Sequence, residues 1–240
     1  MSISAWKPLR SRPTNTHMVS GLYSPSSTDA YIDGTLVAFT KYIPPSLVDP
    51  LIDRTTVIIC SSLEFATYIG SYPSGVGQTT KTKTGSSSVW GVQNQTYIHS
   101  GTSASGDVMT LVHEWGHRVD HQWIHARAGD DTVPSYPSIQ GARSGMADFE
   151  ALWQRVLQLK VEYPASGQYG WSNQCELFAE LFMYYWAGHG PGVTGVAIGG
   201  YDHYIRQLTT GSQTGSDSWT TYAFNLMANL SVPAIPAQYL

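Results

Sequence analysis

Apolar residues recur three or four positions apart in the second half of the chain, and this spacing predicts amphipathic helices. Each expected helix has one apolar face and is bounded by residue types that are typical of helix ends. The predicted helices cover residues 108–125, 145–161, 173–187 and 217–230. The C-terminal half is therefore expected to be mostly helical.

The first half of the chain has a different pattern, in which short β-branched or alternating runs are separated by Gly, Pro, Ser and Thr. Such runs predict strands. The expected strands are Leu36–Tyr42, Thr55–Cys60 and a hairpin made of Val89–Val92 and Thr96–Ser100. Prolines interrupt residues 1–30, which predicts an extended arm, and residues 231–240 predict an extended tail. No linker divides the chain, so residues 1–240 are expected to form a single domain.

One predicted helix carries the sequence His113-Glu114-Trp115-Gly116-His117, which matches the pattern H-E-x-x-H. Residues four apart lie on the same face of a helix, so the two imidazoles can bind a single metal ion. Glu114 then flanks the ion, where it can take a proton from a water molecule. With 8 His in 240 residues, the chance of an accidental match is under about 1 %. The pattern therefore predicts a zinc hydrolase helix.

Two acidic residues, Glu176 and Glu180, stand four apart on the helix predicted for residues 173–187, which carries no other charge. A charge that faces a core is costly unless it is paired or bound to a metal. A catalytic zinc takes three protein ligands, so Glu176 is expected to be the third. Glu180 is expected to hydrogen-bond a ligand imidazole from outside the site. One zinc ion is the cofactor that this set predicts.

Other residues near the first motif are candidates as well. His121 continues the four-residue spacing, but three ligands along one straight helix cannot surround one ion, so His121 is expected either to pack or to contact a ligand from outside the site. Asp120 lies one turn beyond His117, and the sequence leaves open whether it orients a ligand or caps a neighbouring loop. Cys60 and Cys175 lack the paired spacing of a zinc ribbon and are expected to be free, mostly buried thiols.

The two motifs resemble those of the anthrax lethal factor family and of the related Pro-Pro endopeptidases. Residues 113–120 are similar to that family's active-site helix, and Tyr169-Gly170 ahead of residues 176–180 is similar to its second motif, a Tyr-Gly before E-x-F-A-E. The resemblance covers residues 108–186, and residues 1–100 show none.

This resemblance implies an α+β fold of the zincin-like, gluzincin type. We expect a small N-terminal mixed sheet with the H-E-x-x-H helix, followed by a mostly helical C-terminal half. The resemblance also implies the role of each site residue. Glu114 acts as the base, Tyr169 assists at the oxyanion, and zinc is bound by His113, His117 and Glu176.

Composition narrows the choice of partners. The net charge is −4 and only 12 % of the residues are charged, so a nucleic-acid partner is not expected. No apolar run reaches the roughly 18 residues that a membrane span needs. The first residues also lack the apolar core of a standard signal peptide. The sequence leaves the localisation open between an extracellular and a virion-associated protein.

Two classes of function follow from these observations. The first is a zinc-dependent endopeptidase that hydrolyses a protein or peptide substrate, with a zinc-activated water and Glu114 as general base. The alternative is a structural or docking component of a larger assembly, such as a virion or an injection device, in which the metallopeptidase site is accessory or inactive. The extended arm and tail, and a surface rich in Tyr, Ser and Thr, favour the alternative. Stoichiometric zinc distinguishes an enzyme from a pure scaffold.

Overall fold

The computed structural model describes the chain in separate stretches. They are residues 8–9, 21–23, 39, 41–52, 56–60, 87–90, 95–99, 112–120, 122–123, 141–162, 169–189 and 218–233. For the strands among them, the description is of the backbone. Most of the predicted arm and tail, the side chain of Cys60 and the whole of His121 lie outside the described residues.

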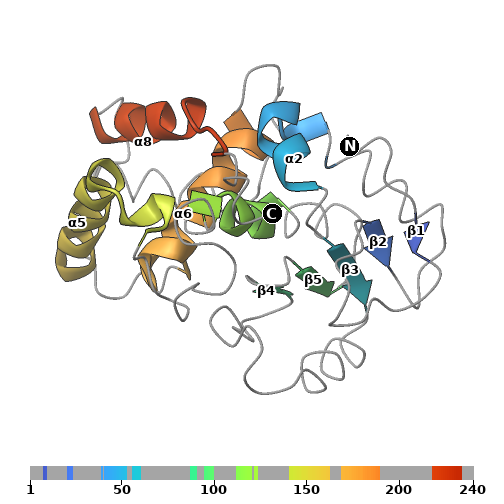
Figure 1. The fold of residues 1–240 in the computed structure, drawn as a ribbon. Coiled ribbons are helices and arrows are strands. Elements are labelled where there is room, and N and C mark those ends of the chain that lie inside the picture. The colour runs from blue at the N-terminus through green and yellow to red at the C-terminus, as the bar shows by residue number, and fades with distance from the viewer. Residues whose placement is uncertain are drawn as a thin grey trace.

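Five short strands pair in one sheet in the order β1-β2-β3-β5-β4 (Figure 1). Neighbours run parallel from β1 to β5, and β4 runs antiparallel to β5. In the central pair, Ile58 of β3 lies opposite Tyr97 of β5. The strand bounds are β1 Pro8–Leu9, β2 Gly21–Tyr23, β3 Thr56–Cys60, β4 Ser87–Trp90 and β5 Gln95–His99.

Helices make up most of the rest of the described chain. Residues 112–120 and 122–123 are helical and are called the His113 helix here. The helices predicted for the C-terminal half are confirmed as α5, as α6 continued by the π-helical η6, and as α8. The remaining bounds are α2 Pro45–Ile52, η4 Arg143–Gly145, α5 Ala147–Glu162, η5 Tyr169–Trp171, α6 Gln174–Met183, η6 Tyr184–His189 and α8 Ser218–Ala228.

The described hydrophobic core is built by helices alone, and this corrects the predicted fold class. Residues whose side-chain burial is described are 84 % helical and include no strand. The expectation of an α+β, zincin-like fold with a small N-terminal mixed sheet is therefore wrong for the residues whose side-chain burial is described. The physical reason is that α2, the His113 helix, α5, α6 and α8 bury their apolar faces against one another. Figure 1 shows α5, α6 and α8 gathered to one side of the strands.

The segment around Phe39 shows why the predicted strand at Leu36–Tyr42 is also wrong. Residues 39, 41 and 42 are helical. Phe39 and Ile43 are buried while Lys41 between them is exposed, and the backbone N–H of Ile43 donates a hydrogen bond of 3.3 Å to the carbonyl oxygen of Phe39, which fits a helical turn rather than a strand. Ile43 and Pro44 are not helical, and the chain is helical again from Pro45. Pro45 begins α2, where the missing backbone N–H costs no intrahelical hydrogen bond.

Trp115 connects this N-terminal helical segment to the His113 helix. Its indole is fully buried, and its Nε1 donates a hydrogen bond of 2.8 Å to the carbonyl oxygen of Leu47. Its ring meets Phe39 edge to face, with 5.2 Å between the ring centroids. A buried indole N–H needs such a partner, so this contact fixes how the His113 helix lies on α2.

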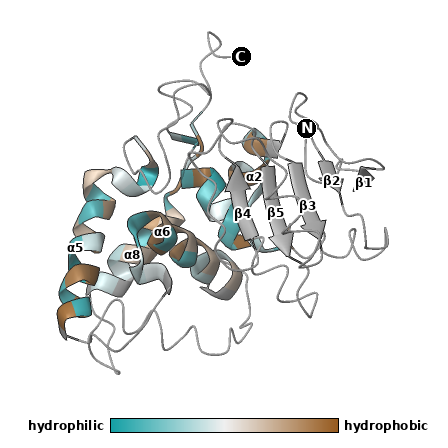
Figure 2. Cartoon of the chain, turned by 90° about the horizontal axis from the view of Figure 1, so that it is seen from below, coloured by the Kyte–Doolittle hydropathy of each residue, from teal (hydrophilic) through white to brown (hydrophobic). Residues whose placement is uncertain are grey.

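The outer helices show the expected two-sided character. In Figure 2, α5 carries polar and apolar bands in turn, as a helix with one face on the core should. Its residues Phe149, Leu152, Val156 and Leu159 are buried. The C-terminal α8 is tied to the start of α5 by a hydrogen bond of 2.6 Å from Tyr222 Oη to the carbonyl oxygen of Asp148. None of the helices in the described stretches has the length and apolar character to cross a membrane.

Candidate metal centre

The N-terminal end of α6 is set by a capping residue, and this places one candidate ligand. Asn173 has extended backbone, and its side-chain oxygen accepts a hydrogen bond of 3.0 Å from the backbone N–H of Glu176. Glu176 therefore lies in the first turn of α6, where the helix dipole favours a carboxylate.

Gly116 allows the His113 helix and α6 to approach closely. A Cβ atom added at Gly116 would lie 2.9 Å from the Cα of Ala179 and 3.0 Å from the Cβ of Phe182. The first of these atoms is backbone, so it cannot be moved without shifting α6. Reasoning from the sequence did not identify this role, although a glycine inside a helix is a signal of close packing.

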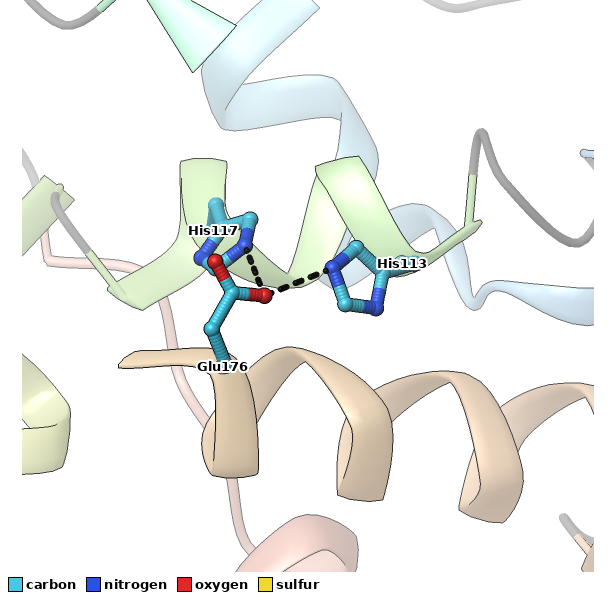
Figure 3. A group of neighbouring side chains, drawn as sticks. All are labelled: His113, His117 and Glu176. Atoms are coloured by element: carbon cyan, nitrogen blue, oxygen red, sulfur yellow. Dashed lines mark ion pairs between the residues drawn. The ribbon is translucent and has the colours of Figure 1, made fainter. Parts of the chain in front are cut away.

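Three candidate ligands converge between these two helices. His113 Nε2 lies 3.2 Å from Glu176 Oε2, and His117 Nε2 lies 3.4 Å from the same oxygen (Figure 3). One ligand atom from each residue falls within 4.8 Å of the others. All three residues are buried, and the most exposed of them, His113, has 7 % of its surface exposed. The structure thus brings together the three residues that the sequence predicted as ligands.

Glu180 contacts the other side of the same cluster. Its Oε1 lies 2.8 Å from His113 Nδ1, the imidazole nitrogen that does not face Glu176. A carboxylate in this position fixes the ring orientation and keeps Nε2 directed at the centre of the cluster. This is the place that the sequence predicts for Glu180.

The contacts within this cluster raise the pKa of an imidazole and lower the pKa of a carboxyl group, so they favour opposite charges. Burial lowers the pKa of His113, but hydrogen bonds to Glu176 and Glu180 and the charge of Glu114 outweigh it and raise the pKa to about 10. Burial raises the pKa of Glu176, but the charges and hydrogen bonds of His117 and His113 hold it well below its usual range. At neutral pH an imidazolium thus faces carboxylates.

Asp120 is hydrogen-bonded to Ser144 of the neighbouring η4 turn. Its Oδ1 accepts a hydrogen bond of 2.6 Å from the backbone N–H of Ser144, and its Oδ2 accepts one of 2.8 Å from the Ser144 hydroxyl. Burial raises the pKa of Asp120 to about 6 in spite of these bonds. These contacts cap the neighbouring η4 turn, and the charge of His117 also acts on Asp120 and lowers its pKa.

For the remaining predicted site residues, the structure gives the element and, for some, the burial. Glu114 is buried, with 4 % of its surface exposed, on the helix of the two imidazoles. Tyr169 begins η5, ahead of α6, and its side chain lies outside the described residues. Cys175 is a free, buried thiol as expected, and burial raises its pKa well above the usual range. Ser144 was not predicted, because nothing in its local sequence indicates a partner 24 residues away.

The residues present fit a zinc ion in their donor chemistry. Two imidazoles and one carboxylate form a known ligand set for catalytic zinc, which leaves a further position for water or substrate. The His113–Glu180 contact supplies the outer carboxylate that metal-binding imidazoles usually have. Buried groups of this kind are costly to hold together without a cation, whether that cation is a proton or a metal.

Comparison with known proteins adds no assignment. No protein-family model matches the chain, and no curated protein matches it.

Replacing Gly116 by alanine tests the close approach of the two helices. Alanine has the higher helix propensity, by about 1 kcal/mol, yet the added methyl group must push against the backbone of Ala179. We expect Gly116→Ala to lower the free energy of unfolding by about 1–3 kcal/mol in urea titrations. Ala151→Gly, at an exposed position of α5, measures propensity alone and should cost about 1 kcal/mol. A Gly116→Ala protein more stable than the wild type would contradict this packing.

Proposed function

We propose that the chain is a zinc-dependent endopeptidase, which hydrolyses peptide bonds in a protein or peptide substrate. The observation that carries the proposal is the convergence of three buried residues of metal-binding type, His113, His117 and Glu176. One possible ligand atom from each lies within 4.8 Å of the others. The resemblance of the two motifs to those of the lethal factor family supports the same activity. Neither support depends on the overall fold class.

The proposed roles follow from position and chemistry. His113, His117 and Glu176 would hold one zinc ion, which when bound supplies Lewis acidity toward a peptide carbonyl and lowers the pKa of a water molecule. Glu180 orients His113 through the contact at Nδ1. The low exposure of the cluster keeps bulk water away and strengthens each of these electrostatic interactions.

Glu114 is the proposed general base. It directly follows His113, so its side chain flanks the ligand pair instead of joining it. In this role its carboxylate accepts a proton from the attacking water and later returns the proton to the leaving amine. Tyr169 is the proposed donor to the carbonyl oxygen as negative charge develops there. Its support is the motif resemblance and its place at the start of η5, next to α6.

A purely structural role accounts poorly for the same residues. A scaffold has no need to gather ionisable groups between two buried helices, because each one costs free energy to desolvate. No contact of the described residues favours a docking function over the enzyme. A peptide-library cleavage assay, run with and without a chelator, tests the activity directly: cleavage that the chelator abolishes is expected.

Zinc content tests the ligand assignment. We expect one zinc ion per chain by atomic emission, and loss of that zinc in His113→Ala, His117→Ala and Glu176→Ala. Each substitution removes one of three protein donors, so affinity should fall steeply. Full zinc occupancy in Glu176→Ala would contradict the assignment of the third ligand.

Zinc binding should also depend on pH, since it displaces the proton of His113. Because the pKa of His113 is raised to about 10, the metal-free site is protonated at neutral pH, and zinc affinity should rise with pH up to that value. Calorimetry in buffers of different ionisation enthalpy measures the protons released. Glu180→Gln removes one of the charges that raises this pKa, so it should release fewer protons at pH 8. Equal release by both proteins would contradict the predicted coupling.

Glu114→Gln separates chemistry from metal binding. The amide has the size of the carboxylate and leaves all three ligands in place, so zinc should stay bound. Turnover of a cleavable peptide should fall by about 10²–10⁴-fold, the usual contribution of a general base. Near-normal turnover with full zinc would remove Glu114 from the mechanism.

A further inference from the structure

A serine outside both ligand helices is hydrogen-bonded to each of them. Ser144 lies in η4 and is fully buried. Its backbone N–H and its hydroxyl donate to the two carboxylate oxygens of Asp120, at 2.6 and 2.8 Å. Its carbonyl oxygen accepts a hydrogen bond of 3.1 Å from Gln174 Nε2. Ser144 thus directs three polar groups at two other elements of the fold.

Both partners of Ser144 lie close in sequence to candidate ligands. Asp120 follows His117 by three residues on the His113 helix, so the two occupy neighbouring positions of one helix face. Gln174 is the first residue of α6 and precedes Glu176 by two. The path Asp120–Ser144–Gln174, called the Ser144 clamp here, therefore joins the end of one ligand helix to the start of the other.

Apolar packing alone leaves one motion of these helices weakly determined. The contact of Gly116 with Ala179 sets how near the helices lie, but apolar contacts are not directional. Hydrogen bonds are directional, and short ones to a carboxylate are the stronger kind. The clamp acts near His117 and Glu176, so it opposes sliding of α6 along the His113 helix where the ligands stand.

The chemistry of the clamp also argues for a positional role. Asp120 is fully buried, and a buried carboxylate is costly even with two hydrogen bonds. An apolar residue at Asp120 would fill the same space without that cost. What the carboxylate adds is a fixed geometry with Ser144, because each of its oxygens is engaged by a different donor of one residue.

We propose that Ser144 is a positioning residue of the metal site, which sets the distance between His117 and Glu176 through Asp120 and Gln174. The inference rests on the proposed metal binding by these ligands. A metal site tolerates deviations of only about 0.2 Å in its ligand distances. Removal of a clamp hydrogen bond is therefore expected to lower the zinc affinity by a larger factor than it lowers the equilibrium constant for folding.

The test compares zinc affinity with stability in the same variants. Ser144→Ala removes the hydroxyl, and Gln174→Met keeps the side-chain length while removing the amide donor to Ser144. Affinity is measured by competition with a chromogenic chelator, and stability by urea unfolding of the metal-free protein. Both variants should lose about tenfold in zinc affinity, the lower end of the range for residues that orient ligands. Both should also alter the visible spectrum of the cobalt-substituted protein.

Two control variants separate position from stability. Gln174 Nε2 also donates to Glu150 Oε2 at 2.6 Å, so Glu150→Ala removes this second partner and leaves the bond to Ser144. Val156→Ala opens a cavity in the buried face of α5 and lowers stability without touching the clamp. Both controls should keep the zinc affinity and the cobalt spectrum of the wild type.

The outcomes distinguish the clamp from the metal site itself. Unchanged zinc affinity in Ser144→Ala and Gln174→Met overturns the clamp, even with reduced stability, and leaves the metal site standing. Equal affinity loss in Val156→Ala overturns it too, because the effect then follows stability. If Ser144→Ala does not fold, the zinc affinities of Gln174→Met and Glu150→Ala are compared, and equal affinities overturn the clamp. A wild-type chain that binds no zinc overturns the proposed function and this inference together.

Discussion

The structure depends on the burial of ionisable groups where the His113 helix and α6 meet. Desolvation makes each of these groups unfavourable alone, and only their mutual contacts offset the cost. The two helices must therefore stay close and in register, which explains several contacts away from the cluster. Gly116 permits the approach, Trp115 anchors one helix on α2, and Asn173 defines where the other begins. The buried set is His113, His117, Glu176 and Glu180.

Local periodicity made part of this fold predictable. α5 and α8 follow from apolar residues at helical spacing, because each has one face on the core and one on the solvent, whereas α6 is buried along its whole length. The helix around Phe39 did not follow, since a short stretch fits alternation and helical period equally well, and the choice between them depends on its packing against Trp115. The α+β expectation came from the motif resemblance, which says nothing of how the rest of the core is filled.

The same distinction applies to the site. The pair His113 and His117 could be predicted because residues four apart on a helix meet by geometry alone. Glu176 required a chemical argument, that an acidic residue on an apolar helix needs a partner. Ser144 could not be found in this way, because its contacts join segments whose proximity arises only in the folded chain. The role of Asp120 stayed open in the sequence for the same reason, because its contact with Ser144 forms only in the folded chain.

Cys175 stands directly before the proposed third ligand, yet its sulfur lies 3.9 Å from the hydroxyl of Ser144. Burial keeps this thiol protonated, and a protonated thiol is a poor ligand. The donors that remain are nitrogen and oxygen, which suit borderline ions such as zinc better than soft ions such as copper(I). The same protonation slows oxidation, since the thiolate is the form that reacts with peroxide. The sulfur atom next to Glu176 is therefore kept unreactive by its burial.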